Sequence, residues 1–230
     1  MSIFKRISLF WYVTAGLEVF LCALTWRQMN RDPMLYLFAL FQDMLNEITL
    51  LAVAIPIFAG IILKETALSN LWILRLGGRG AWKRQIEKRI LIISGIYTIL
   101  LLLPLSIVWL IFGYRVDLAM NLTYFGLSLL GYFFSFNIIA FVIGIIKLKW
   151  NKDVLAFLVA YALCFMPFVV TKILRFVPID YSSIVNSSLL THANGYQWVQ
   201  HAIICGWMAI VAFLCQRVIT VQSNRKDIMM

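Results

Sequence analysis

The chain has 230 residues, of which 63% are hydrophobic and only 13% are charged. Soluble domains carry about 25% charged residues, and a soluble fold of this length could not bury so much apolar surface, whereas a lipid bilayer solvates it. In a soluble protein the formal net charge of +10 would suggest a nucleic-acid partner. Here the basic residues stand between apolar runs, where they set membrane topology. The sequence therefore predicts a single membrane domain over residues 1–230 that binds no nucleic acid.

Six apolar runs are close to the roughly 20 residues that a helix needs to cross the hydrocarbon core. Open strands would leave backbone groups unpaired in lipid, so each run is predicted to be an α-helix. The expected fold is all-α, with six transmembrane helices at about residues 7–26, 45–63, 90–112, 122–146, 154–174 and 201–221.

The connections between these runs indicate their orientation. With a cytoplasmic N-terminus, most basic residues fall on the cytoplasmic side, and the basic residues left outside are Arg27, Arg31, Arg115, Lys172 and Arg175. This bias agrees with the positive-inside rule and predicts that both termini are cytoplasmic.

The first predicted span contains one acidic residue, Glu18, near its middle. A carboxylate at this depth costs several kcal/mol unless it is paired, protonated or in contact with water. Two interpretations are open: Glu18 is a substrate or gating contact in the bundle interior, or it is a neutral group that is hydrogen-bonded to a neighbouring helix. The segment that follows, residues 27–44, starts polar and becomes apolar, so it fits either an interfacial helix or an early start of the second span.

The cytoplasmic connection between the second and third spans, residues 64–89, has a pattern of its own. Its part from Thr66 to Leu76 can form a short helix with Leu68, Leu71 and Trp72 on one face. Two glycines follow, as is common beyond a helix end, and a basic amphipathic stretch leads back to the membrane. Anionic lipid explains the charge of this loop, but the apolar stripe is more typical of a surface that docks a protein partner.

Further groups were considered as functional residues. Lys172 and Arg175, one turn apart near the outer end of the fifth span, could attract an anionic group or pair with an acidic residue, although snorkelling to lipid head groups is the simpler reading. The four cysteines form no CxxC pair and are expected to act as small hydrophobic residues. His192 and His201 have no third ligand nearby, so no metal site is expected.

The loop and the layout together resemble the permease subunits of type-2 ABC exporters. The residues that carry the resemblance are Lys64-Glu65 at the end of the second span, the amphipathic segment 66–76, Arg75 with Arg79, and the basic stretch 83–89. The resemblance implies that segment 66–76 is a coupling helix and that a cytosolic ATP-binding subunit contacts Glu65, Leu68, Leu71, Trp72, Arg75 and Arg79.

The resemblance also implies the remaining partners and the location. ATP and Mg would be bound by the partner subunit, because this sequence contains no G-x-x-x-x-G-K-[ST] motif and needs no cofactor of its own. A second copy or a sister permease would complete the transmembrane unit in the lipid of a bacterial plasma membrane. Since the chain is short and lacks a large external domain, it is most similar to the small permeases of peptide-export and bacteriocin-immunity systems.

Two other classes of function are possible from the sequence. One is a non-catalytic membrane scaffold or immunity protein that binds its target directly. The other is an intramembrane enzyme, which is less favoured because the sequence has no HExxH, no paired glutamates and no CxxC at one depth. The prediction is therefore a non-enzymatic transmembrane subunit of an exporter of peptides or other amphipathic substrates, with Glu18, Lys172 and Arg175 as pathway or gating residues.

Overall fold

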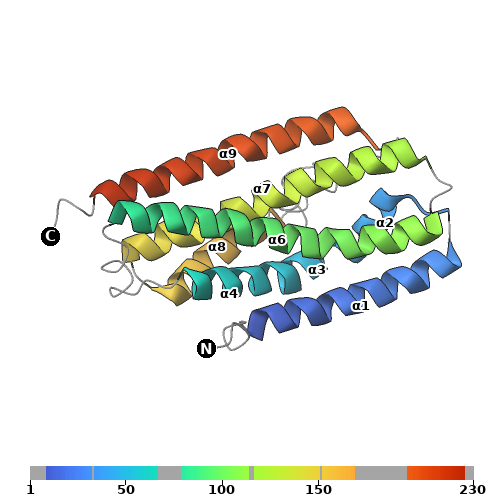
Figure 1. Cartoon of the computed structure of the whole chain (residues 1–230), viewed down its shortest axis with the longest axis horizontal. Coiled ribbons are helices and arrows are strands. Elements are labelled where there is room, and N and C mark those ends of the chain that lie inside the picture. Colours follow the sequence, from blue (N-terminus) through green and yellow to red (C-terminus); the bar gives the residue numbers. More distant parts are fainter. Residues whose placement is uncertain are drawn as a thin grey trace.

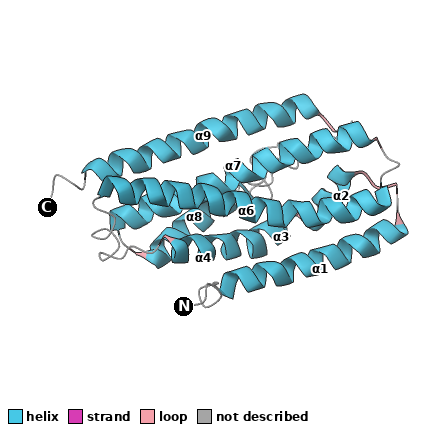
Figure 2. Cartoon of the chain, in the orientation of Figure 1, coloured by secondary structure: helices cyan, strands magenta, loops and turns pink. Residues whose placement is uncertain are grey.

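The computed structural model describes residues 9–32, 34–66, 79–113, 117–150, 152–168 and 196–225. In these ranges the chain is helical apart from short turns and connections and contains no β-strand (Figure 2). The elements in chain order are α1 (Leu9–Arg31), α2 (Leu37–Met44), α3 (Glu47–Thr49), the π-helical segment η2 (Leu50–Ala54), α4 (Ile55–Glu65), α6 (Arg79–Gly113), α7 (Leu118–Trp150), α8 (Asp153–Phe168) and α9 (Trp198–Arg225).

Four of these helices are long and apolar enough to cross a membrane. They are Leu9–Arg31, Arg84–Phe112, Leu118–Trp150 and Trp198–Gln222. These four correspond to the first, third, fourth and sixth predicted spans. The prediction of an all-α fold is thus confirmed for the described residues, and four of its helices are long and apolar enough to span a membrane.

The second and fifth predicted spans are less regular. The second is helical from Glu47 to Glu65 but changes from α to π geometry and back within that length. The fifth, α8, has 16 described residues, and the rest of the predicted span, residues 169–174, lies outside the described part of the chain.

The helices run roughly along one common direction (Figure 1). Helix α7 packs against α9, α6, α8 and α4, whereas α1 packs against α6 and α4 on another side of the bundle. We call the end of the bundle at which α4, α7 and α9 finish and α6 and α8 begin the basic end. The opposite end holds the connections from α1 to α2 and from α6 to α7.

Large aromatic side chains fill the centre of the bundle. The ring of Phe58 lies 4.7 Å from that of Phe136 and 5.1 Å from that of Tyr97, measured between centroids. The outward faces of α1 and α9 instead expose Phe20 and Trp207, which suits side chains that contact lipid.

Residues 37–65, comprising α2, α3, η2 and α4, traverse the bundle from the opposite end to the basic end, and we call them the broken crossing (Figure 1). Asn46 sits at the first break, where its side-chain oxygen accepts the N–H of Thr49 at 2.9 Å and its amide donates to the carbonyl of Asp43 at 3.1 Å. One side chain thus caps the start of the second helical piece and bonds the last turn of α2. Segment 27–44 therefore extends α1 to Arg31 and then forms a separate short helix.

The π-helical segment follows from proline chemistry and a long-range hydrogen bond. The N–H of Ile55 donates to the carbonyl of Leu50, and Pro56, the next residue, has no N–H with which to continue the series. The carbonyl of Ala54 accepts the hydroxyl of Tyr97, at 2.7 Å. A residue of α6 thus stabilises the irregular part of the broken crossing.

Helix α7 fixes both ends of the broken crossing. At the opposite end the side-chain oxygen of Asn121 accepts the N–H of Leu37 at 2.8 Å, and at the basic end Lys147 Nζ donates to the carbonyl of Leu63 at 2.9 Å. The indole N–H of Trp109 also donates to the carbonyl of Leu35, at 2.8 Å. The position of the broken crossing is therefore fixed by hydrogen bonds from the continuous helices α6 and α7.

Candidate functional site

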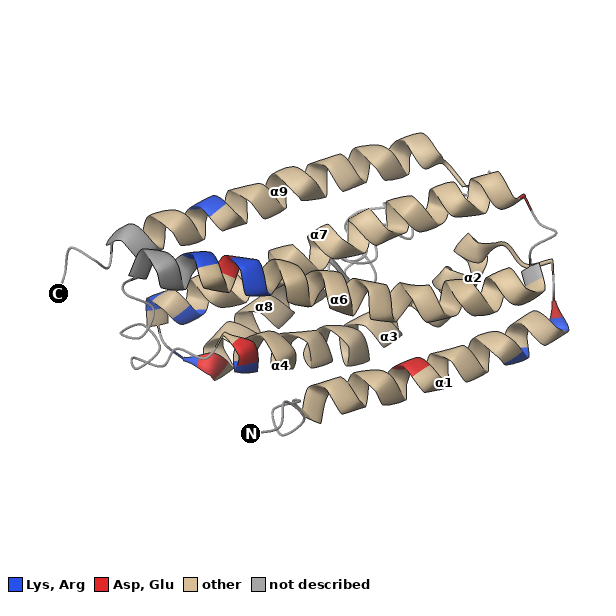
Figure 3. Ribbon diagram, viewed as in Figure 1, with Lys and Arg blue, Asp and Glu red and all other residues tan. Residues whose placement is uncertain are grey.

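Charge is unevenly distributed along the bundle (Figure 3). The basic residues of the described chain at or near the basic end are Lys64, Arg79, Lys83, Arg84, Lys88, Arg89, Lys147, Lys149, Lys152, Arg217 and Arg225. By contrast, Arg27 and Arg31 lie in the last turns of α1, towards the opposite end. The bundle thus has one strongly positive end, at which segment 67–78 leaves α4 and returns to α6.

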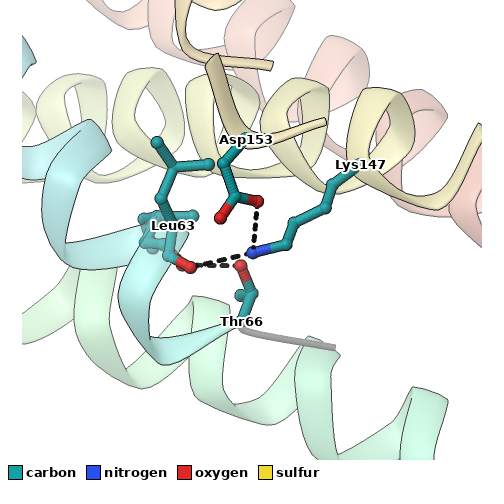
Figure 4. A network of polar contacts seen from close by, with 5 residues as sticks. Leu63, Thr66, Lys147 and Asp153 are labelled. Atoms are coloured by element: carbon teal, nitrogen blue, oxygen red, sulfur yellow. Dashed lines mark hydrogen bonds and ion pairs between the residues drawn. The ribbon is translucent and has the colours of Figure 1, made fainter. Parts of the chain in front are cut away.

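A buried lysine joins three helices at this end (Figure 4). Lys147 on α7 is almost fully buried, and its ammonium group donates to the carbonyl of Leu63 on α4 and pairs with Asp153 on α8, each at 2.9 Å. Asp153 is in the first turn of α8, where a carboxylate is favourable, and Leu63 is in the last turn of α4, where a cation is favourable. We call this group of Lys147, Leu63 and Asp153 the lysine junction.

The end of α4 receives two further bonds beside the lysine junction. The guanidinium of Arg89 on α6 donates to the carbonyl of Glu65 at 3.3 Å. The hydroxyl of Thr66 donates back to the carbonyl of Ile62 at 2.6 Å. The carbonyl of Glu65 is at the helix end, where such groups often lack a partner within the helix, whereas the carbonyl of Ile62 also accepts the backbone N–H of Thr66 at 2.9 Å.

The residues predicted to contact a partner are only partly described. Glu65 ends α4 at the basic end, and Arg79 begins α6, although the side chain of Arg79 is outside the described part. Leu68, Leu71, Trp72 and Arg75 also lie outside the described residues, as do Lys172 and Arg175. Residues 82–89, expected to lead back to the membrane as a basic amphipathic stretch, lie within the first turns of α6, which begins at Arg79.

Glu18 is described and lies in the bundle interior. Its side chain is 8% exposed, on the face of α1 that also buries Thr14, Leu21 and Thr25. Neither of its carboxyl oxygens has a hydrogen-bond partner within the described chain. Of the two interpretations of Glu18, the described contacts do not supply the hydrogen bond that the second requires.

At the opposite end a half-buried tyrosine and a buried histidine form a pair among aromatic rings. The hydroxyl of Tyr196 is hydrogen-bonded to Nδ1 of His201 at 3.0 Å, and the ring of Tyr124 lies 5.1 Å from that of Tyr196. Burial raises the pKa of the Tyr196 phenol above its ordinary value, so this group is neutral at physiological pH. No group of three or more His, Cys, Asp or Glu side chains in the described part could hold a metal ion.

The lysine junction was missed by the sequence analysis. Lys147 was grouped with Lys149 and Lys152 as a topology signal, because all three follow an apolar run. The one available sign was Asp153, an acidic residue a short connection away from Lys147. The carbonyl of Leu63 could not be foreseen as its partner, since it lies 84 residues earlier in the chain.

No protein-family model, curated protein or solved structure matches this chain. The resemblance to exporter permeases therefore depends on the loop motif and the layout of the helices alone.

Proposed function

We propose that this chain is the transmembrane subunit of an ATP-driven exporter in a bacterial plasma membrane. In this proposal the chain crosses the membrane six times, through α1, the broken crossing, α6, α7, α8 with the residues that follow it, and α9. Both termini and the basic end face the cytoplasm.

The observation that carries the proposal is the anchoring of the loop between α4 and α6. The described chain on either side of segment 67–78 is fixed at the basic end: α4 by Lys147 and Arg89, and α6 through the bond from its own Arg89 to Glu65. A soluble subunit that pushes on this segment would therefore act on α4, α6, α7 and α8 together. This is what a coupling segment requires, and a loop that only contacts lipid head groups has no need of it.

The remaining parts of the mechanism follow from the sequence resemblance. ATP and Mg would be bound by a separate cytosolic subunit whose cleft receives Leu68, Leu71 and Trp72, with Glu65, Arg75 and Arg79 around them. Two transmembrane subunits, either two copies of this chain or this chain and a sister permease, would enclose the path. Glu18, Lys172 and Arg175 would contact peptides or other amphipathic substrates along that path.

Co-purification tests this proposal. The tagged chain, purified in mild detergent from its native host, is expected to retain an ATP-binding subunit, and the double substitution Leu71→Asp with Trp72→Asp is expected to release it. Trp150→Asp, at an exposed tryptophan of the same end but outside the loop, serves as the matched control and should retain the subunit.

Two results would contradict the proposal. One is the absence of any ATP-binding protein from the purified complex. The other is equal retention in the loop variant and in wild type. A different protein that co-purifies without ATPase activity would favour the scaffold or immunity function instead.

A further inference from the structure

Helix α1 has an inward face that is more polar than its outward face. Thr14, Glu18 and Thr25 are spaced by four and seven residues, which places them on one side of the helix, and all three are buried. The outward face carries Val19, Phe20 and Trp26, all of them exposed and apolar. A helix in lipid is expected to turn such groups inward, but inward polar groups also need partners.

Two of these three residues have no partner among the described residues. Thr14 donates its hydroxyl to the carbonyl of Phe10 at 2.8 Å and is satisfied. Both carboxyl oxygens of Glu18 and the hydroxyl of Thr25 make no hydrogen bond, although Glu18 is 8% exposed and Thr25 is fully buried. A buried polar group without a hydrogen bond costs free energy. A ligand that forms the missing hydrogen bond would therefore bind favourably.

No described side chain supplies a counter-charge for Glu18. Helix α1 packs against α2, α4 and α6, and α2 contains no basic residue. Glu18 is in the middle of α1, whereas the basic residues of α4 and α6 all lie near the basic end: they are Lys64, Arg79, Lys83, Arg84, Lys88 and Arg89. A cation that pairs with the Glu18 carboxylate would therefore come from outside the described part of the chain.

The surroundings of Glu18 define the ligand further. The carboxyl lies within electrostatic range of the Tyr97 hydroxyl, which is itself engaged with the carbonyl of Ala54. Leu21 is on the same face, between Glu18 and Thr25, and Thr25 is about 10 Å further along the helix. An N–H-bearing cation with an apolar body matches the Glu18 carboxyl in an otherwise apolar seam, and Thr25 lies too far away to bind the same cation.

We propose that the inward face of α1 is a binding site for the ammonium or guanidinium group of an amphipathic ligand, with Glu18 as its ion-pair partner. As a statement about transported cargo this inference rests on the proposed function, and it specifies that the cargo is cationic. The binding itself needs no ATP-binding subunit and can be measured on the purified chain.

The test uses decylammonium as the probe and decanol as its uncharged match. Thermal unfolding of the purified chain in a non-ionic detergent, followed by tryptophan fluorescence, should show a saturable rise in midpoint with decylammonium that decanol does not produce. In Glu18→Gln the apparent affinity should fall about tenfold, the effect of losing one charge-assisted hydrogen bond. Glu18→Gln removes a buried charge and is expected to fold, and Glu18→Asp should retain part of the binding.

Asp43→Asn is the matched control. The carboxylate of Asp43 is exposed and already accepts a hydrogen bond from Gln28, so its removal should leave the response to decylammonium unchanged. An equal response in wild type and Glu18→Gln would overturn the proposal. So would a wild-type response that decanol reproduces.

A second readout places the ligand on the helix. Cys22 is free, half-buried and one turn beyond Glu18, so decylammonium should slow its alkylation by N-ethylmaleimide, as measured by peptide mass spectrometry. Cys215, also free and half-buried but on α9, should react at an unchanged rate. Equal slowing at both cysteines would contradict a site on α1. A negative result in these binding experiments would not change the result of the co-purification. A negative co-purification would likewise leave the binding of decylammonium to α1 testable.

Discussion

At the scale of single residues, Lys147 differs from the nearby Lys149 in its burial and in its contacts. Lys147 is buried and bonded to two other helices, whereas Lys149 on the same helix is exposed and lies 4.5 Å from the ring of Trp150. Both follow the same apolar run, and both carry the same charge. Their environments therefore predict different energetic roles.

Lys147→Met tests this difference. The substitution removes a hydrogen bond to the Leu63 carbonyl and an ion pair to Asp153, and it should lower the free energy of unfolding by about 2 kcal/mol. Lys149→Met removes only an exposed cation–π contact and should cost about 0.5 kcal/mol. Equilibrium unfolding of the two purified variants in detergent would measure both values. Equal losses of unfolding free energy in the two variants would show that the lysine junction does not stabilise the fold more than the exposed Lys149 does.

The same comparison shows what could be predicted from the sequence about individual residues. A carboxylate inside an apolar run is conspicuous, so the sequence singles out Glu18, and the structure buries its side chain. Lys147 was not singled out, because a lysine at the end of an apolar run usually reaches the lipid head groups. The Lys147 side chain is buried because it bonds to the end of α4 and the start of α8. The sequence alone does not show that these two helix ends lie beside α7.

At the scale of elements, the hydropathy of the sequence predicts the long helices, but it does not predict the breaks in the broken crossing. Apolar length alone predicted α1, α6, α7 and α9, because a continuous apolar run in lipid has helix as its favoured state. The break at Asn46 and the π-helical segment depend on individual hydrogen bonds and on Pro56. Hydropathy averaged over a window cannot register such single bonds.

Asn46→Ala should weaken the broken crossing at its first break. The substitution removes the acceptor for the N–H of Thr49 and the donor to the carbonyl of Asp43, at an expected cost of about 1 kcal/mol. Asn46→Asp keeps the acceptor and should recover most of the loss. Thermal unfolding in detergent would compare the two. A loss in Asn46→Asp as large as that in Asn46→Ala would argue against capping as the cause.

Asn121→Leu should detach α2 without unfolding the rest of the bundle. The change leaves the buried N–H of Leu37 without its acceptor, which costs about 1–3 kcal/mol. Hydrogen exchange should become faster at Leu37–Met44 and stay unchanged at Ile55–Glu65. Asn121→Asp, which retains an acceptor oxygen, is the control. Unchanged exchange in α2 would show that Asn121 does not hold it.

At the scale of the whole molecule, the charge at the two ends predicts how the bundle sits in a membrane. The basic end is expected to face the cytoplasm. Lys152, before α8, and Asp117, before α7, are exposed at the two ends and provide labelling positions. In a background with the four native cysteines replaced by alanine, Asp117→Cys should react with a membrane-impermeant maleimide on intact cells. Lys152→Cys should react only after permeabilisation, and the reverse pattern would contradict this orientation.

The attachment of the broken crossing to α7 has a consequence for the order in which the chain matures. Leu37 and Leu63 each bond to a residue 84 positions later, Asn121 and Lys147 respectively. At about 5–20 residues per second, each partner leaves the ribosome roughly 4–17 s after the group that it will satisfy. Residues 37–65 therefore wait with open backbone groups at both ends until α7 is synthesised. The second segment to be made is therefore expected to be among the last to reach its final form.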